Sequence, residues 1–376
     1  MKADIVVIGA GMAGASVAAF LALDRRVVLL EAEESAGYHT TGRSAAMWIE
    51  NYGPEDVRAL SRASRGFFER PPEGFATGGA DAPLMRRRPV LLLATAAQEP
   101  ALRDALAGGQ GMRRIEVAEA TAMLPALRPG YLAGAALEDD AFDIDVAALH
   151  QGFLKMLRAH EGELGLRRRA GRIERRDGVW HVETASGDVF QAPIVVNAAG
   201  AWGDEVAAIA GVTPIGLVPK RRTAAIVDPS PFDVSGWPMT IDVEDGWYVR
   251  PEARTRLMVS PADETPTHAH DVQPEEIDVA IGIDRMQQAL DIPVIRVEHR
   301  WAGLRTFSPD GSLVLGADPR AEGFYWCVGQ GGYGIQTSPG AGRLLADLVL
   351  GRDAGPMGRD VVSAVSPGRF TGGMSR

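Results

Sequence analysis

The chain has little cysteine and no excess of basic residues. Its one cysteine, Cys327, excludes a disulfide framework and any metal cluster built from several thiolates, and it fits a reducing compartment. The net charge of −10 argues against nucleic acid or an anionic membrane surface as the main partner, because both attract basic proteins. A small molecule is therefore the expected partner.

Long apolar runs are also missing. The longest, Val90 to Ala97, is too short to cross a bilayer, and the first residues pass from an apolar stretch directly into glycines, without the separate apolar region and cleavage site of a signal peptide. We therefore expect a cytoplasmic protein with no stable membrane span. The 376 residues, 46% of them apolar, suffice to bury one large domain or two interleaved domains.

A glycine motif follows a short apolar run at residues 4–8. The letters GAGMAG place Gly9, Gly11 and Gly14 ahead of an alanine-rich helix, and a second strand ends at Glu31. In such a βαβ unit the first glycine permits a tight turn, the second lets a pyrophosphate approach the backbone, and the third lets helix and strand pack closely. Glu31 is placed for ribose hydroxyls. The unit predicts NAD, NADP or FAD, with NADP least favoured because the acid repels a 2′-phosphate.

Three later stretches bear on which dinucleotide is bound. The loop GYHTTGRSAAM at 37–47 offers small residues and Arg43 to a pyrophosphate and a flavin edge, although a surface loop is the alternative. The strand IVVNAAGAW at 194–202 ends in small residues that admit a ligand, although an ordinary Rossmann strand has the same pattern. The third stretch, WCVGQGGYGIQ at 326–336, precedes an amphipathic helix expected to begin near Gly334. It predicts a second helix N-terminus with exposed N–H groups.

Taken in order, these motifs resemble a known family. The chain resembles the D-amino acid oxidase and glycine oxidase family of FAD enzymes, most closely the bacterial D-arginine dehydrogenase type. The resemblance is carried over nearly the whole length by VIGAGMAGAS, GYHTTGRSAA, DIDVAALHQGFL, VVNAAGAW, PKRR, WAGLR and QGGYGIQTS.

The resemblance implies an α/β fold with two parts. A Rossmann-like FAD-binding domain is expected from residues 1–75, 140–215 and 302–376. A discontinuous substrate-binding domain, of α+β type and built on an antiparallel sheet, is expected from residues 76–139 and 216–301. A monomer or a homodimer is expected.

The cofactor implied by the resemblance is FAD, bound without a covalent link. When flavin N5 accepts a hydride, negative charge develops around N1 and the C2 oxygen, and donors fixed beforehand stabilise it. A glycine-rich stretch brings backbone N–H groups close to the ring; a simple strand-to-helix turn is the alternative. The implied cofactor-binding residues are Gly9, Gly11, Met12, Gly14, Glu31, Arg43, Ser44, Ala45, Met47, Ala198, Gly200, Trp202, Gly303, Gly331, Gly332, Tyr333, Gly334, Ile335 and Gln336.

The substrate residues are also carried over from the resemblance. Arg221 in PKRR and Arg305 in WAGLR match the arginines that bind the substrate carboxylate, which guanidinium does with two parallel donors. Tyr52 and Tyr248 match tyrosines that line the substrate pocket in the relatives. Gly332 is expected among the catalytic residues together with these two tyrosines and the two arginines. The alternatives are surface arginines paired with acids, and core tyrosines whose hydroxyls are satisfied.

The expected reaction is oxidative deamination of a D-amino acid by hydride transfer from the α-carbon to flavin N5. The resulting 2-imino acid hydrolyses to a 2-keto acid and ammonia, and positioning does most of the catalytic work. Met47 and Val90 stand where D-arginine dehydrogenase carries a histidine and an acid, and Ile49 replaces a polar residue. We therefore expect apolar or uncharged side chains to be preferred over D-arginine.

Other functions remain open. A 2-hydroxy acid or an N-methyl amino acid would keep the carboxylate contacts, and a non-catalytic flavin-binding protein is a further alternative. An NAD-linked enzyme is disfavoured because there is no second GxGxxG motif. No metal site is expected, since His268 and His270 lie in a proline-rich loop without a companion motif. The electron acceptor, quinone or dioxygen, is left open.

Overall fold

The computed structural model describes residues 1–75 and 83–371. Residues 76–82, which begin an expected segment of the substrate-binding domain, and residues 372–376, which end the last expected segment of the FAD-binding domain, lie outside the described residues. Its first sheet comprises β1 (Ile5–Ile8), β2 (Val27–Leu30), β9 (Glu163–Gly165), β13 (Ile194–Asn197), β20 (Val314–Ala317) and β21 (Phe324–Val328). The strand order is β20-β21-β13-β1-β2-β9, and all neighbours are parallel except β20 and β21. β1 and β2 are wholly apolar because both faces of the sheet are covered.

Helices cover one face of this sheet and a small sheet covers the other. The helices are α1 (Met12–Ala22), α2 (Glu55–Glu69), α5 (Val146–Ala159), α8 (Ser338–Val349) and α9 (Gly358–Val365), which share one apolar core with the sheet. The opposite face packs on α6 (Gly203–Ile209) and on the antiparallel strands β10 (Ala170–Arg176), β11 (Val179–Thr184) and β12 (Val189–Ala192). This is the predicted Rossmann-like layer arrangement.

The second sheet has nine strands. They are β5 (Val90–Ala94), β6 (Met112–Ile115), β7 (Gly134–Glu138), β14 (Val218–Val227), β15 (Met239–Asp242), β16 (Tyr248–Glu252), β17 (Arg256–Ser260), β18 (Thr265–Pro266) and β19 (Val297–Phe307). Every pair is antiparallel except β5 with β15, so the predicted antiparallel sheet is confirmed. The accompanying helices are α3 (Glu99–Gly108), α4 (Val117–Met123) and α7 (Glu276–Ala289).

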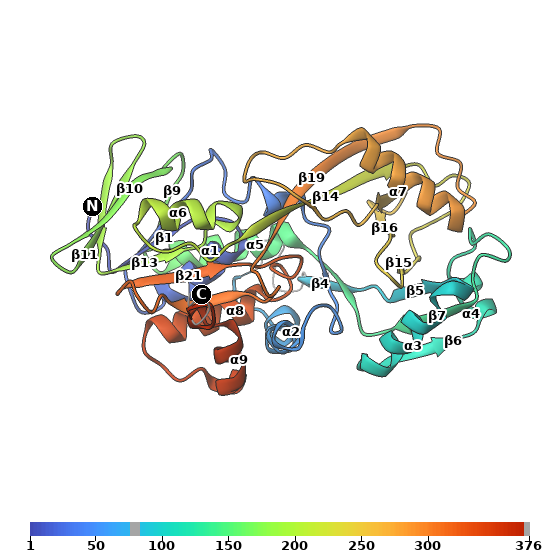
Figure 1. Ribbon diagram of the computed structural model, residues 1–376, viewed down its shortest axis with the longest axis horizontal. Coiled ribbons are helices and arrows are strands. Elements are labelled where there is room, and N and C mark those ends of the chain that lie inside the picture. The colour runs from blue at the N-terminus through green and yellow to red at the C-terminus, as the bar shows by residue number, and fades with distance from the viewer. Residues whose placement is uncertain (76–82, 372–376) are drawn as a thin grey trace, which may run out of the picture.

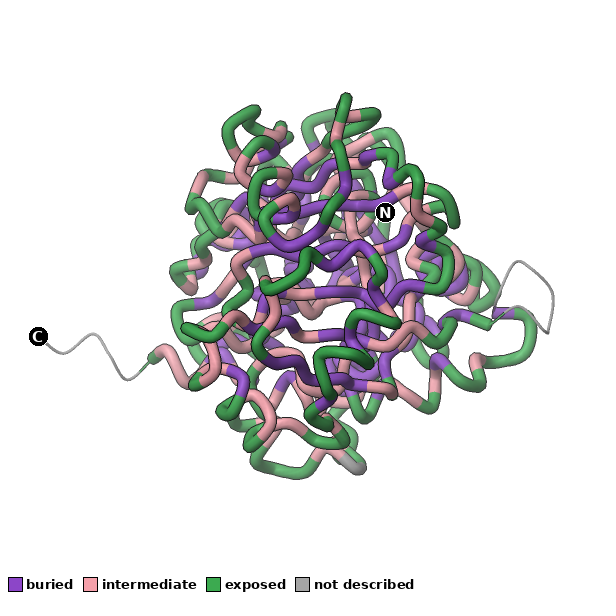
Figure 2. Tube along the Cα trace, turned by 90° about the vertical axis from the view of Figure 1, so that its right-hand side faces the viewer, coloured by how far each residue is buried: buried purple, intermediate pink, exposed green. Residues whose placement is uncertain are grey.

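The long antiparallel pair β14 and β19 runs from one half of the molecule to the other (Figure 1). A small sheet is formed by β3 (Met47–Trp48), β4 (Met85–Arg87) and β8 (Phe142–Ile144). Along the chain, each of these strands comes between a strand of one large sheet and a strand of the other. Buried segments fill the interior and exposed ones lie on the outside (Figure 2). In the described residues, no helix combines the length and apolar content that crossing a membrane requires.

The helix expected near Gly334 begins later. Residues Gly331 to Thr337 form turns, and α8 starts at Ser338. Pro339 sits in the first turn of the helix, where its missing N–H is not needed, and the glycines before it carry no helix preference. The predicted start was therefore wrong by one turn.

Candidate functional site

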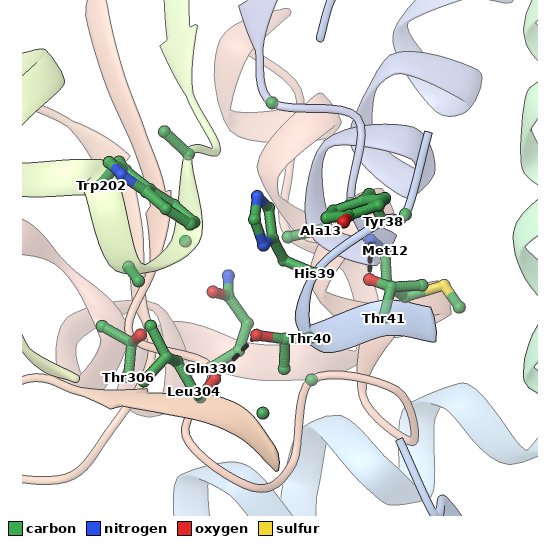
Figure 3. A pocket seen from close by; sticks show the side chains of 18 of the residues that line it. Met12, Ala13, Tyr38, His39, Thr40, Thr41, Trp202, Leu304, Thr306 and Gln330 are labelled. Atoms are coloured by element: carbon green, nitrogen blue, oxygen red, sulfur yellow. Dashed lines mark hydrogen bonds between the residues drawn. The ribbon is translucent and has the colours of Figure 1, made fainter. Parts of the chain in front are cut away.

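One cavity is lined both by the glycine turn after β1 and by residues of β14 and β19. Figure 3 shows Met12, at the start of α1, and Leu304 and Thr306 of β19 among its lining residues. The cavity brings together most of the predicted site residues. Those that line it are Gly9, Gly11, Met12, Glu31, Arg43, Ser44, Ala45, Ala198, Gly200, Trp202, Tyr248, Gly303, Arg305, Gly331, Gly332, Gly334 and Ile335. Six predicted residues are not in the lining: Gly14, Met47, Tyr52, Arg221, Tyr333 and Gln336.

The turn after β1 depends on glycine at two positions. Gly9 has φ of +101°, and a Cβ there would lie 2.5 Å from the Ala198 carbonyl oxygen. A Cβ on Gly14 would lie 1.8 Å from the Gly9 carbonyl oxygen, so Gly14 shapes the turn from behind the cavity. The N-terminus of α1 faces the cavity, where the Met12 amide donates to Thr41 Oγ1 at 2.9 Å (Figure 3). Thr41 was not predicted.

Glu31 lines the cavity at the end of β2. Its side chain is 9% exposed, and its two oxygens accept the amides of Ala10 at 2.9 Å and Glu33 at 3.0 Å. These bonds hold the carboxylate at the rim of the glycine turn, where its remaining lone pairs can accept ribose hydroxyls.

His150, another residue that the sequence reasoning missed, supports the same turn from α5. Its Nε2 lies 2.9 Å from the Ala10 carbonyl oxygen. Because a carbonyl only accepts, Nε2 carries the hydrogen and donates. Burial lowers the pKa of His150 below its ordinary value of 6.5, so the ring is neutral at neutral pH.

Acidification should therefore destabilise the protein through His150. Below pH 6.5, the ordinary histidine value, the unfolded chain takes up the proton while the folded one resists it, so the free energy of unfolding falls with falling pH. The His150→Gln variant keeps a donor but does not titrate. We expect its melting temperature to fall less between about pH 7 and about pH 5 than that of the wild type; equal losses would mean that His150 is not the titrating group.

The loop of residues 37–46 forms one wall of the cavity. Thr40 Oγ1 donates to the Leu304 carbonyl at 2.8 Å, and His39 packs against Trp202 with ring centroids 4.6 Å apart (Figure 3). Arg43 lines the cavity with part of its side chain. Its guanidinium is used elsewhere, donating to the Val272 and Ala302 carbonyls and pairing with Asp271.

The glycine-rich turn after β21 forms the opposite wall. The Gly331 amide, with φ of +49° at that residue, donates to the Thr306 carbonyl at 2.8 Å. Among the described residues, the amides of Gly332, Gly334 and Ile335, which line the cavity, have no protein acceptor. These amides are free to donate to a ligand.

Two predicted residues of this turn serve packing instead. The Gln336 side chain is 2% exposed, and its amide bonds to the Ile49 backbone and to the Ser61 hydroxyl. The Tyr333 ring packs edge to face on Tyr52, with centroids 5.0 Å apart. Gln336 therefore holds the turn against Ile49 and α2, and Tyr333 holds it against Tyr52.

Arg305, on β19, lines the cavity and is partly buried. Its Nη1 donates to the Tyr52 hydroxyl at 3.0 Å, and in the described part of the chain no carboxylate pairs with it. A Cβ on Gly332 would lie 2.5 Å from that hydroxyl and 3.0 Å from Arg305 Nη1. The glycine therefore leaves room for the Arg305–Tyr52 pair, and the guanidinium keeps donors for an anion.

Arg221 does not face the cavity. Its guanidinium is held by Glu275 and Asp278 beside α7 and lies 3.7 Å from Asp263. The next residue, Arg222, lines the cavity instead; its Nε donates to the Asp263 carbonyl at 2.9 Å and its Nη2 to Glu264 at 3.2 Å. The cavity-facing arginine of β14 is therefore Arg222, one residue after the predicted one.

Met47 is 6% exposed and packs in an apolar cluster rather than in the cavity wall. The cluster also holds Val90 and Tyr248, with Ile49 packed against it. Two members of the cluster core, Tyr248 and Ala224, line the cavity. The substrate end of the cavity is thus backed by apolar side chains.

The described residues fit a dinucleotide with a flavin ring. The cavity carries a helix N-terminus and a carboxylate at one end, and bare backbone with free amides further along. Side chains at Gly9 or Gly332 would collide with the cavity walls. Cys327 is 1% exposed and outside the lining, and burial raises the pKa of its thiol to about 12, as expected of a buried small residue. Nowhere in the described ranges do three or more His, Cys, Asp or Glu gather to suit a metal ion.

Comparison with known proteins identifies relatives across nearly the whole chain. A family model described as FAD dependent oxidoreductase (DAO) matches residues 4–348. FAD-dependent oxidoreductase domain-containing protein 1 of Mus musculus is 26% identical over 405 residues, covering 93% of this chain and 81% of that protein. Glycine oxidase of Pseudomonas aeruginosa is 26% identical over 373 residues, covering 94% of this chain and 96% of that protein. The solved structure of glycine oxidase from Geobacillus kaustophilus aligns with a TM-score of 0.81 at 22% identity, covering 94% of this chain and 95% of the other.

Proposed function

Because the chain belongs to the DAO family of FAD-dependent oxidoreductases, we propose that it oxidises an amino acid at the bond between the α-carbon and the nitrogen. The observation that carries this proposal is the Arg305 guanidinium, which faces the cavity and has a hydroxyl rather than a carboxylate as its partner. Two parallel guanidinium donors suit an α-carboxylate. FAD, when bound, supplies the hydride acceptor.

Each of these cavity residues has a separate role in the proposed reaction. Arg305 binds the α-carboxylate, and Tyr52 keeps the guanidinium oriented. The amides of Gly332, Gly334 and Ile335 line the cavity and would donate to the negative charge that develops on a bound flavin when it accepts a hydride. Holding the α-carbon in line does most of the catalysis, and the 2-imino acid product hydrolyses to a 2-keto acid and ammonia.

The preferred substrates are D-amino acids with apolar or uncharged side chains. The cluster of Met47, Val90 and Tyr248, which lies behind the substrate end of the cavity, supports this preference, because apolar side chains cannot compensate the desolvation of a basic side chain. The D-arginine dehydrogenase subtype stays a prediction, and the apolar wall argues for a different side chain.

A second candidate is an N-methyl amino acid or a 2-hydroxy acid. The similarity to a glycine oxidase favours the first of these, since the carboxylate contact is unchanged when the nitrogen carries a substituent. We also propose the predicted division of the chain into a discontinuous FAD-binding domain and a substrate-binding domain, a cytoplasmic location, and quinone or dioxygen as the electron acceptor of a monomer or homodimer.

The proposed function is tested by measuring reduction of the flavin in the absence of dioxygen. D-leucine, D-methionine, D-phenylalanine, D-arginine and the L-enantiomers are added separately to the FAD-loaded protein while the visible absorption of the flavin is followed. We expect rapid bleaching with the apolar D-amino acids and at least about tenfold slower bleaching with D-arginine. Fast bleaching by D-arginine contradicts the side-chain preference. Bleaching only by sarcosine or 2-hydroxy acids moves the assignment to the second candidate.

A further inference from the structure

The hydroxyl that orients the Arg305 guanidinium belongs to a loop. Tyr52, whose hydroxyl accepts from Arg305 Nη1 at 3.0 Å, lies in the segment of residues 49–53, between β3 and α2. No helix or strand includes these residues, so contacts with the rest of the molecule must fix their position. If Arg305 binds a substrate carboxylate, as in the proposed function, the groups that hold this loop also determine how well it binds.

A buried carboxylate holds the loop directly before Tyr52. Glu138 is the last residue of β7, in the second sheet, and is 3% exposed. Its Oε1 accepts the backbone amides of Glu50 at 3.1 Å and of Asn51 at 3.4 Å. Because Asn51 is joined to Tyr52 through one rigid peptide plane, a shift of these amides moves the tyrosine as well.

The Glu138 carboxylate has no cation beside it. Within residues 1–75 and 83–371, no Lys, Arg or His side chain pairs with it, and its cross-strand neighbours are Val90 and Met112. Burial raises the pKa of Glu138 above its ordinary value of 4.5, and hydrogen bonds from the loop oppose that rise. A buried charge without a cation is costly unless hydrogen bonds offset the cost. The loop amides supply those bonds.

Other contacts fasten the same loop on both sides of Tyr52. The Ile49 amide and carbonyl are bonded to the Gln336 side chain at 3.2 and 3.1 Å. The Asn51 side chain bonds to the backbone amide and carbonyl of Gln110 at 2.7 and 2.9 Å. The loop is therefore held by the turn before α8 and by the segment before β6, and the Tyr52 side chain remains to contact Arg305.

We infer that Glu138 is a positioning residue for the Arg305–Tyr52 pair. By holding the amides of Glu50 and Asn51 it fixes the loop, and the Tyr52 hydroxyl then keeps the Arg305 guanidinium in the orientation that receives a substrate carboxylate. Glu138 does not line the cavity, so it acts only through these residues. The second sheet thus carries Arg305 on β19 and the support of its partner on β7.

The Glu138→Leu variant removes the acceptor and keeps an apolar side chain in its place. With the amino acid that reduces the flavin fastest, we expect KM to rise about tenfold while kcat stays within about twofold, because misplacement of a binding group is felt at the site. Glu138→Gln keeps an oxygen that can accept both amides, so its KM should stay within about threefold of the wild type. A wild-type KM in Glu138→Leu overturns the inference.

Asp139→Leu is the matched control. Asp139 follows Glu138 in the chain, but its side chain is 43% exposed and pairs with Arg87 and Arg113 at 3.3 and 3.4 Å. Exposed ion pairs contribute little, so its KM should remain within about twofold of the wild type. An equal rise of KM in this control would mean that any lost carboxylate at the end of β7 has the same effect, which overturns the positioning role.

A double-mutant cycle with Tyr52→Phe distinguishes positioning from a general loss of structure. If Glu138 acts through the Tyr52 hydroxyl, Glu138→Leu should raise KM by no more than about twofold in a chain that already carries Tyr52→Phe. If the two factors multiply instead, Glu138 acts by another route and the inference is wrong.

A second readout needs no turnover. The unreactive acid 4-methylpentanoate has the carbon skeleton and carboxylate of leucine without its amino group, and its Kd for the FAD-loaded protein is followed through the visible spectrum of the flavin. We expect about tenfold weaker binding by Glu138→Leu and no further loss when Tyr52→Phe is added. Should Glu138→Leu not fold, Glu138→Asp replaces it in both measurements, since a carboxylate one methylene shorter cannot reach both amides.

The two readouts separate the possible failures. If no amino acid reduces the flavin of the wild type but the acid binds with the expected pattern, the proposed function fails and Glu138 still positions a carboxylate site. If amino acids reduce the flavin and Glu138→Leu behaves as the wild type, only the role of Glu138 fails. If the wild type neither reacts with an amino acid nor binds the acid, both fail.

Discussion

Replacing Arg305 with methionine is expected to lower kcat/KM for an amino acid by about 100-fold or more, mainly through a higher KM, while FAD stays bound. Methionine keeps much of the side-chain volume but removes the guanidinium. Losing one partner of a buried, hydrogen-bonded charge pair costs about 2 to 5 kcal/mol, and about 1.4 kcal/mol corresponds to a factor of ten. Tyr52 would also lose its partner at 3.0 Å, but its own hydroxyl cannot replace a positive charge.

Arg300→Met is the matched control. Arg300 belongs to the same strand, but its side chain is 46% exposed and pairs with Glu276 at the surface. We expect kinetics within about twofold of the wild type, since exposed ion pairs contribute little. Steady-state kinetics and the ratio of flavin to protein absorption check both variants. Unchanged kinetics in Arg305→Met would remove Arg305 from the site.

The dinucleotide turn was predictable because its determinants are local. Gly9, Gly11, Gly14 and Glu31 lie within one βαβ unit, and the backbone needs them for reasons that the sequence itself carries: a positive φ, a close approach and a helix contact. The pairing of β1 with β2 then places the carboxylate beside the turn.

The cavity-facing arginine of β14 was not predictable in the same way. Neighbouring residues of a strand point to opposite faces of the sheet. A shift of one position along β14 therefore moves a side chain from the face that lines the cavity to the face beside α7. Pairing with β19 decides the face: Arg222 lies opposite Gly303, and Lys220 lies opposite Arg305. Directly opposed residues share a face, so Arg221 must turn toward α7. The sequence PKRR alone does not reveal the register in which β14 pairs with β19.

His150 and Thr41 were missed for another reason: their partners are distant in sequence. His150 bonds to Ala10 and Thr41 to Met12, and neither pair leaves a local motif. A signal for His150 did exist. It shares one face of α5 with Phe153, Leu154 and Leu157, all buried, and a histidine on an apolar helical stripe needs a hydrogen-bond partner inside the protein.

The Gly14→Ala substitution should have the largest effect on cofactor binding. The added Cβ would lie 1.8 Å from the Gly9 carbonyl oxygen. The position of a Cβ is fixed by its own backbone, and the carbonyl is itself a backbone group, so neither can rotate away. Either α1 moves outward or the turn opens, and the amides at the start of the helix then leave the phosphate position. We expect the Kd for FAD to rise by about 5-fold to 150-fold, since a strained insertion into a packed site costs about 1 to 3 kcal/mol and about 1.4 kcal/mol corresponds to a factor of ten.

Gly66→Ala serves as the control, because a Cβ at Gly66 in α2 meets nothing within 4 Å. Alanine also favours a helix interior over glycine by about 0.5 to 1 kcal/mol, so this variant should bind FAD normally and melt slightly higher. Titration of the FAD-free proteins with FAD, together with circular dichroism, distinguishes the outcomes. A folded Gly14→Ala protein that binds FAD normally would show that the turn tolerates a side chain there, and the assignment of the phosphate site to the start of α1 would have to be withdrawn. A folded protein without FAD would locate the phosphate contacts at that turn, because the substitution changes no side chain that lines the cavity.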